Sequence, residues 1–446
     1  MLIERSSYGY AYPEDIPGSR CGPEDGPWPR PYKILQENQL WSEFSKLARP
    51  QSFALDSSNR PCRADCVNFQ PSPRSKTQDR YVATQLDING RMWTFTGVFD
   101  GHLGDVTVEH VAYHLPIIVR NFLQHALDGE KKLPPALVSD LFSRSIIAFD
   151  DAIANDVLDL FGGLENLDEF SDAQIRAIIN DQHNGGTNWK KTRLCMYGTT
   201  ALVALVDPEH RNLWVANLGD CQAVLVAPKG SSGDDWDVEV LTMNHNGDND
   251  CEIERVRKLH PGESECVVDR RVLGALAPFR CLGDVPFKQP PVFSRRILYN
   301  LFPGFHDTSP WEEFLVRNLT PPYITAEPEV IHRPLDHRPV AISNSEELNE
   351  QVLPHFLILA SDGFTDLCGS QGEQVKLIKE WASNTCLESL SRGDEGVNNH
   401  DRASNNMAMR LLRRVLGEDC LSVSRVLTLD METAWIDDTT AVVQTL

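Results

Sequence analysis

Two short motifs in which glycine follows aspartate stand directly after apolar runs that are typical of buried strands. Phe99-Asp100-Gly101-His102 ends the run from Trp93, and Ser361-Asp362-Gly363 follows the run from Phe356 to Ala360. A strand end holds a carboxylate in a fixed position, and the glycine lets the backbone turn so that its carbonyl can face a hard cation. The two motifs therefore predict a Mg²⁺ or Mn²⁺ site to which both carboxylates contribute.

A third aspartate, Asp437, precedes the last apolar run, from Thr439 to Leu446. Three carboxylates at strand ends that share one cleft predict a two-metal hydrolytic centre, because paired cations make water acidic enough to attack near neutral pH. Each Asp-Gly pair taken singly is a common turn signal. The prediction rests on the three residues together.

The bulk composition excludes several other classes of protein. The chain has 446 residues, 41% of them hydrophobic, which is enough for a large core. A net charge of −22 argues against a nucleic-acid surface, and no apolar run reaches the roughly 18 to 20 residues of a membrane span. The eleven cysteines contain no CxxC pair, which favours reduced thiols over zinc sites or disulfides.

The N-terminal region bears on location and on domain organisation. Glu4, Glu14 and Asp15 are unlike a mitochondrial presequence, so the default expectation is a cytoplasmic or nuclear protein. Residues 1–60 are rich in Pro, Gly, Ser and charge, with one short helix expected around Gln39 to Leu47. We expect 1–60 to be a largely irregular extension and 61–446 to be one domain with a surface flap at 285–320.

The periodicity of the main region predicts strands and helices in blocks. A β-hairpin with an Asn89-Gly90 turn is expected over 82–99, and two long amphipathic helices over 106–127 and 134–158. Residues 199–206, 213–217 and 223–226 read as an antiparallel meander, 160–193 as a loop-rich excursion, and 251–259, 375–381 and 405–416 as helices. Hairpins with helix pairs between them indicate an α+β fold of two stacked antiparallel sheets flanked by helices, a four-layer α-β-β-α sandwich.

Further motifs occur in an order that is found in one family. They are Tyr197-Gly-Thr-Thr-Ala201, Asn217-Leu-Gly-Asp220, Leu241-Thr-Met-Asn-His245, Pro278-Phe-Arg-Cys-Leu-Gly-Asp284 and Ile436-Asp-Asp-Thr-Thr440. With these motifs the chain resembles the PPM-type, or type 2C, metal-dependent protein serine/threonine phosphatases from about Arg74 to Leu446. Within that family it is most similar to the pyruvate dehydrogenase phosphatase catalytic subunits. This resemblance implies a mitochondrial location as the alternative to the cytoplasm or nucleus, although no presequence is visible.

The resemblance implies roles for individual residues. Asp100 is expected to bridge two ions, Gly101 to ligate through its carbonyl, and Asp362 and Asp437 to hold one ion, with Asp79 as a further metal ligand. His102 matches the general acid that the family is proposed to use on the leaving serine or threonine oxygen.

Two other residues bear on phosphate and metal binding. Arg74 lies four residues before Gln78-Asp79 and is expected to bind phosphate. The alternative, to which we give equal weight, is a solvated surface arginine. Gln78 replaces the glutamate that the family usually has, which predicts a weakened second metal site because one negative charge is missing.

Together these features predict a phosphatase that hydrolyses phosphoserine and phosphothreonine in proteins with two Mg²⁺ or Mn²⁺ ions. The expected partner is a phosphoprotein substrate, with no nucleic acid, no membrane and a monomeric catalytic unit. The alternative is an inactive pseudophosphatase that binds phosphoproteins as a scaffold, for which Gln78 is the one supporting feature. A third reading, hydrolysis of small phosphate esters, also fits the motifs.

Overall fold

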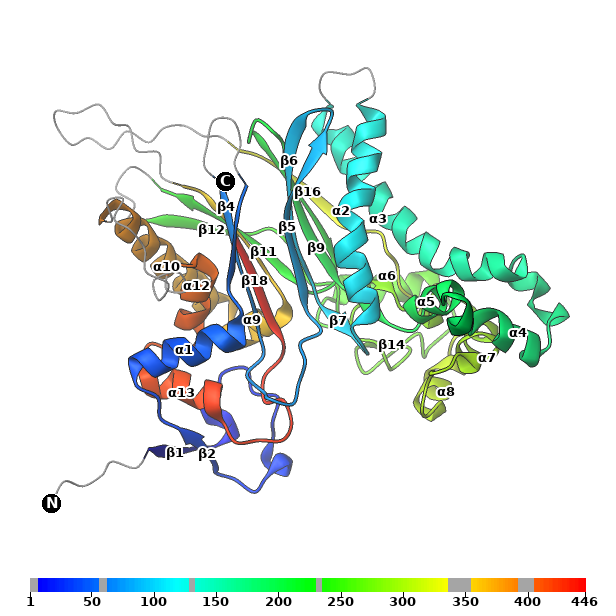
Figure 1. Cartoon of the computed structure of the whole chain (residues 1–446), viewed down its shortest axis with the longest axis horizontal. Coiled ribbons are helices and arrows are strands. Elements are labelled where there is room, and N and C mark those ends of the chain that lie inside the picture. Colours follow the sequence, from blue (N-terminus) through cyan, green and yellow to red (C-terminus); the bar gives the residue numbers. More distant parts are fainter. Residues whose placement is uncertain (1–6, 56–61, 128–132, 230–234, 336–353, 392–404) are drawn as a thin grey trace.

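The computed structural model describes residues 7–55, 62–127, 133–229, 235–335, 354–391 and 405–446. Two antiparallel sheets lie face to face at its centre, and helices cover the outer face of each (Figure 1). This arrangement confirms the predicted four-layer α+β sandwich.

The first sheet has five strands in the order β16-β10-β9-β6-β5. Its strands are β5 (Arg80–Ile88), β6 (Arg91–Phe99), β9 (Ala201–Val206), β10 (Asn212–Leu218) and β16 (Glu329–Pro334). The predicted hairpin is β5 and β6, and its turn residues Asn89 and Gly90 both have positive φ angles, 55° and 76°. Such angles are those of a type I′ turn, for which Asn-Gly is a strong sequence signal.

The second sheet has six strands in the order β12-β11-β17-β18-β4-β3. Its strands are β3 (Gln51–Ala54), β4 (Arg63–Phe69), β11 (Gln222–Pro228), β12 (Trp236–Val240), β17 (Phe356–Ala360) and β18 (Thr439–Thr445). The predicted meander was therefore wrong in one respect, because β10 and β11 belong to different sheets. The 219–221 connection crosses from one sheet to the other, and strand periodicity carries no information on which sheet a strand joins.

Alternate side chains of the strands belong to different core clusters. In β9, Val203 and Leu205 pack toward the outer helices, whereas Leu202 and Ala204 pack between the sheets. Strands β4, β11, β17 and β18 of the second sheet divide their side chains in the same way. Each sheet is thus buried on both faces, which explains the continuous apolar runs in the sequence.

Helices α2 (Val106–Ala126) and α3 (Pro135–Leu158) cover the five-stranded sheet and match the two long helices predicted there. Val108, Val111, Leu115 and Val119 lie on the buried face of α2 at helical spacing. Burying an aliphatic side chain of this size contributes about 1.5–3 kcal/mol.

The six-stranded sheet is covered by helices from both ends of the chain. They are α1 (Glu37–Ala48), α9 (Asp362–Cys368), α10 (Gln371–Ser391), α12 (Met407–Leu416) and α13 (Cys420–Thr428). Leu40 and Phe44 of α1 are fully buried in this core, and β3 extends the sheet. The hairpin β1 (Tyr8–Ala11) and β2 (Arg30–Lys33) also belongs to this segment. The division at residue 60 stays a prediction; residues 1–6 and 56–60 of the proposed extension lie outside the described residues.

Residues 160–193 and 285–320 contain helices that the sequence did not predict. They are α4 (Asp172–Ile179), α5 (Thr187–Leu194), α7 (Pro291–Arg296) and α8 (Ser309–Leu315), joined by the 3₁₀ turns η3 (Asp159–Phe161), η4 (Leu164–Glu169), η5 (Gln182–Asn184), η6 (Val285–Phe287) and η7 (Leu298–Asn300). Ile175 and Ile179 share a core with Phe293 and Ile297, so the excursion and the flap form one lobe at the lower right of Figure 1. Helices of six to eight residues are too short to give a clear period.

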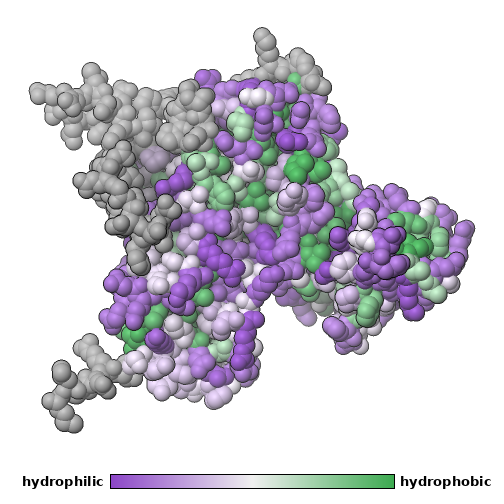
Figure 2. Space-filling model, viewed as in Figure 1, coloured by the Kyte–Doolittle hydropathy of each residue, from purple (hydrophilic) through white to green (hydrophobic). Residues whose placement is uncertain are grey.

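The remaining described elements are short and lie outside the two large sheets. They are the 3₁₀ turns η1 (Pro13–Asp15) and η2 (Pro23–Asp25), helix α6 (Asp250–Leu259), and the two-residue strands β7 (Gly101–His102), β8 (Gly198–Thr199), β13 (Val267–Val268), β14 (Arg271–Val272) and β15 (Leu282–Gly283). The face in Figure 2 is mainly hydrophilic, with small hydrophobic patches, some of them on the lobe. None of the helices that the structure describes is both long enough and apolar enough to cross a bilayer.

Candidate metal centre

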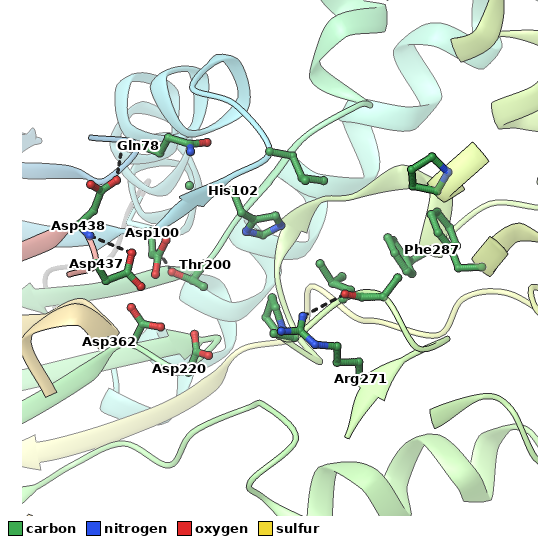
Figure 3. A pocket seen from close by; sticks show the side chains of 18 of the residues that line it. Gln78, Asp100, His102, Thr200, Asp220, Arg271, Phe287, Asp362, Asp437 and Asp438 are labelled. Atoms are coloured by element: carbon green, nitrogen blue, oxygen red, sulfur yellow. Dashed lines mark hydrogen bonds between the residues drawn. The ribbon is translucent and has the colours of Figure 1, made fainter. Parts of the chain in front are cut away.

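The strand ends that carry the predicted aspartates meet in a cleft of about 460 Å³ between the two sheets. Asp100 follows β6 of the first sheet, Asp362 follows β17 of the second, and Asp437 precedes β18. Figure 3 shows these three carboxylates grouped together, with Asp220 beside Asp362. We call Asp100, Asp220, Asp362, Asp437 and Asp438 the acidic wall of the cleft.

The backbone around Asp100 is fixed by two threonines. The Asp100 amide donates to Thr200 Oγ1 at 3.1 Å, and the Asp100 carbonyl accepts from Thr199 Oγ1 and from the Thr200 amide, both at 2.9 Å. A Cβ at Gly101 would lie 2.7 Å from Val108 Cγ1 and 2.8 Å from the Gln78 carbonyl, so only glycine fits here. The Asp-Gly pair is therefore required by packing as well as by any role in ligation.

Three carboxylates of this region, Asp79, Asp100 and Asp220, have raised pKa values. Burial, followed by the charges of Asp79 and Asp362, raises the pKa of Asp100 well above its ordinary value. Burial and the charge of Asp438 raise the pKa of Asp79 to about 7, and burial and Asp362 raise that of Asp220 to about 6. Such a cluster gains stability from a bound cation, because positive charge offsets both causes of the shift.

Two unpaired oxygens near the acidic wall also support the binding of a cation in this cleft. Asp362 Oδ1 and the side-chain oxygen of Gln78 are buried, and neither has a hydrogen-bond partner among the described residues. Unpaired buried oxygens cost free energy unless another group satisfies them. Carboxylate and amide oxygens suit Mg²⁺ or Mn²⁺, so the residues present fit a hard divalent cation.

Asp79 lies behind the acidic wall, next to Gln78 in the chain, and its pKa is raised by the charge of Asp438. Asp79 is fully buried and does not line the cleft, whereas Gln78 lines it. Both oxygens of Asp438 already accept hydrogen bonds, from the Gln78 amide at 2.6 Å and from Gln70 Nε2 at 2.8 Å. These two bonds hold the Asp438 side chain beside Asp437.

His102 lies at the cleft and is held by Asp284. The distance from His102 Nε2 to Asp284 Oδ2 is 2.6 Å, and the Cys281 thiol donates to the same oxygen at 3.0 Å. Burial opposes the charge of His102, but Asp284 outweighs it and raises the pKa of His102. Arg280, from the same motif as Asp284, binds Glu252 instead, with Arg280 Nε and Glu252 Oε2 3.0 Å apart.

His102, Cys281 and Asp284 also place three potential metal-ligand atoms within 4.8 Å of one another. Burial raises the pKa of the Cys281 thiol well above its ordinary value, and the pKa of His102 is raised as well. The Cys281 thiol therefore keeps its proton near neutral pH, and metal ligation would require its loss. The cluster is better suited to holding a proton on His102.

Arg74 is not brought into the cleft. Its guanidinium lies 3.0 Å from Glu432, and the two side chains are 65% and 83% exposed. The arginines that do line the cleft are Arg20 and Arg271, neither of which the sequence singled out. Arg20 was missed because nothing in the Pro- and Gly-rich N-terminal segment predicts where it packs.

The side of the cleft opposite the carboxylates has a different composition. We call Arg271, Leu276, Phe287, Trp311 and Phe314 the flap wall. Figure 3 shows Arg271 and Phe287 across from the grouped carboxylates, with His102 between the two sides. Phe287, Trp311 and Phe314 come from 285–320, the segment that the sequence predicted to be a surface flap.

Comparisons with known proteins agree with this geometry. A family model described as Protein phosphatase 2C matches residues 156–393. The human mitochondrial pyruvate dehydrogenase phosphatase 2 is 28% identical over 78% of this chain and 70% of its own length. A protein phosphatase 2C homolog from Schizosaccharomyces pombe is 28% identical over 83% of this chain and 74% of its own, and the human mitochondrial pyruvate dehydrogenase phosphatase 1 is 29% identical over 68% and 58%. The chain therefore belongs to the protein phosphatase 2C family of metal-dependent protein serine/threonine phosphatases.

Proposed function

We propose that the cleft is a dinuclear centre that hydrolyses phosphoserine and phosphothreonine in proteins. The residues that would hold two Mg²⁺ or Mn²⁺ ions are Asp79, Asp100, the Gly101 carbonyl, Asp362 and Asp437. The observation that carries the proposal is the meeting of carboxylates from both sheets at one cleft, where burial and mutual repulsion raise the pKa values of Asp100 and Asp220.

Different residues of the chain would position the reaction and supply its proton. When bound, the cations would supply Lewis-acid activation of water and of the phosphate. Asp100, tied to Thr199 and Thr200, fixes the position of that chemistry relative to the first sheet. His102 holds a proton against Asp284 and donates it to the departing serine or threonine oxygen.

The relatives support a narrower proposal on substrate and location. Two of them are named as mitochondrial phosphatases of pyruvate dehydrogenase, which supports a phosphorylated enzyme subunit as substrate and a mitochondrial location in place of the cytosol or nucleus expected from the sequence. The net charge of −22 supports a protein partner over nucleic acid. We propose that residues 61–446 form one catalytic domain that acts as a monomer.

The pseudophosphatase alternative rested on Gln78. We favour catalysis because a decayed site would be expected to lose some of its acids, whereas this chain keeps Asp79, Asp100, Asp362 and Asp437 together with His102.

The test is phosphate release from a phosphothreonine peptide and from p-nitrophenyl phosphate by the purified full chain. We expect turnover that requires Mn²⁺ or Mg²⁺, stops with EDTA, and falls by about a thousandfold or more in Asp100→Asn, because the acceleration depends on the charge of that carboxylate. Metal-independent turnover, or none at millimolar Mn²⁺, would contradict the proposal. Activity on p-nitrophenyl phosphate alone would favour the small-ester reading.

A further inference from the structure

We propose that Arg20, from the N-terminal segment, is the guanidinium that binds the substrate phosphate in this cleft. The proposal rests on the phosphatase function above and adds a binding residue that lies far outside the family's motifs. It gives the N-terminal segment a direct part in substrate binding.

The backbone that carries Arg20 is held firmly against the body of the protein. The Arg20 amide donates to the Trp435 carbonyl at 2.9 Å, and Trp435 is itself 1% exposed. Arg425 Nη1 donates to the Asp15 carbonyl at 2.6 Å on the same segment. Gly18 lies against the backbone of Asp366 and Leu367 in α9, the helix that begins at Asp362. Arg20 is thus placed by the same elements that place two of the proposed metal ligands.

The side chain of Arg20 points into the cleft. It lines the cavity with the acidic wall, and its Nη2 forms an ion pair with Asp437 Oδ2. The side chain is 53% exposed, so it remains accessible to a ligand that enters the cleft. A guanidinium has five N–H donors, and one carboxylate contact leaves donors free for phosphate oxygens.

The other arginines in question are less well placed. Arg74 pairs with Glu432 at the surface and does not line the cleft. Arg271 lies on the flap wall, where its Nη1 donates to the Ala275 carbonyl at 3.1 Å (Figure 3). Among the described residues, Arg20 is therefore the cleft arginine in contact with a carboxylate of the acidic wall.

The chemistry of phosphate explains why an arginine at this position matters. A phosphate monoester is close to a dianion at neutral pH, and the acidic wall would repel it without added positive charge. Arginine binds phosphate oxygens bidentately, and an arginine whose backbone is already fixed loses less entropy on binding. A phosphate bound at the carboxylate cluster lies next to Arg20 because Arg20 contacts Asp437.

The test compares four variants of the full chain: Arg20→Gln, Arg20→Lys, Arg74→Gln and the control Lys46→Gln. Lys46 is 68% exposed on α1 and pairs with Glu43, so its substitution removes the same charge away from the cleft. Calorimetry of inorganic phosphate binding to the Mn²⁺-loaded protein gives a readout that needs no turnover. We expect Arg20→Gln to raise the phosphate Kd and the KM for a phosphothreonine peptide about tenfold, or 1.4 kcal/mol, and Arg20→Lys about threefold.

The remaining outcomes decide between clear alternatives. Lys46→Gln leaves the phosphate Kd unchanged if the proposal is right. An unchanged phosphate Kd in Arg20→Gln, with a lowered Mn²⁺ Kd, would make Arg20 only a counterion of Asp437 and overturn it. A loss in Arg74→Gln instead of Arg20→Gln would also overturn it. Arg20-dependent phosphate binding by a wild-type chain without turnover would support this inference while contradicting the proposed activity. Unfolding midpoints within a few degrees of wild type confirm that the variants are folded.

Discussion

The acidic wall and the flap wall face each other across one cleft but are built in different ways. The acidic wall takes its carboxylates from the ends of β6, β17 and β18 and from the 219–221 crossing between the sheets. The flap wall packs on a core of its own, in which Phe287 stacks on Phe314 with ring centroids 4.4 Å apart. The carboxylates of the cleft thus belong to the sandwich, and Phe287 and Phe314 on its other side belong to a separate core.

The separate cores of the two walls have a consequence for mutation. Side chains of the flap wall pack with one another and with α6 and α8, away from the cluster between the sheets. A change in the flap wall should therefore alter substrate binding without disturbing metal binding. A change in the acidic wall should alter metal binding first, because the carboxylates that fit a cation lie there.

The largest effect is expected for Asp79→Asn, behind the acidic wall. The pKa of Asp79 is about 7 in the folded protein, well above its ordinary value of 3.8, so ionisation opposes folding. In the metal-free protein this penalty is absent below about pH 4, grows as the pH rises, and is complete above about pH 7. Asp79→Asn removes it, so the metal-free variant should be more stable than wild type at pH 8, while its Mn²⁺ Kd rises about a hundredfold.

Urea unfolding at pH 5 and pH 8 with EDTA, together with Mn²⁺ titration, measures both effects. Asp237→Asn is the control, because Asp237 is a 64% exposed surface residue paired with Lys229. Equal stability of Asp79→Asn and wild type at pH 8 would show that the buried charge is already compensated.

The next effect concerns His102, which stands between the two walls. Asp284 raises the pKa of His102, so a protonated His102 persists to higher pH, and activity that needs this proton is lost as the pH rises through that pKa. Asp284→Asn should lower the pKa of His102, move the alkaline limb of the kcat profile to lower pH, and reduce kcat at pH 8 about tenfold.

The matched variant is Cys281→Ala, which removes the other donor to Asp284 but keeps the His102–Asp284 contact. Its alkaline limb should stay close to that of wild type. If Asp284→Asn keeps the wild-type limb as well, the proton in question is not on His102.

Much of the acidic wall was predictable from sequence because its signals are local. A buried strand followed by Asp-Gly fixes where a carboxylate lies, and Asn89-Gly90 fixes a hairpin through its positive φ angles. Such features depend on neighbours in the chain. An Asp-Gly pair after a strand also predicted the position of Asp362, and the strand that begins two residues after Asp437 predicted that Asp437 lies at a strand end.

The parts that escaped prediction depend on contacts between distant segments. His102 and Asp284 are 182 positions apart, and Asp284 adopts a left-handed conformation that no local pattern announces. Arg20 reaches the cleft only because its backbone docks on Trp435.

A smaller effect is expected when the acidic wall gains a charge. The side-chain oxygen of Gln78 is buried without a hydrogen-bond partner among the described residues, in a cleft that fits a cation. Gln78→Glu should lower the Mn²⁺ concentration for half-maximal rate about fourfold, which corresponds to one added charge acting through a largely hydrated site. Gln39→Glu adds the same charge on the exposed first turn of α1 and should not move that concentration. No shift in Gln78→Glu would show that the missing acid does not limit metal binding.

The smallest effect is expected on the flap wall, where a change should weaken binding of a protein substrate without altering the metal requirement. Trp311 lines the cleft and packs on Phe314 with ring centroids 5.5 Å apart, a position from which it can contact the protein part of a substrate. Trp311→Ala should raise the KM for a phosphothreonine peptide about threefold, since an aromatic contact contributes about 0.5–1.5 kcal/mol. The kcat/KM for p-nitrophenyl phosphate and the Mn²⁺ requirement should stay near wild type, as they should in the control Tyr113→Ala, a 69% exposed residue of α2. A parallel loss on both substrates would mean that the flap wall also positions the phosphate, and the division of labour between the two walls would then fail.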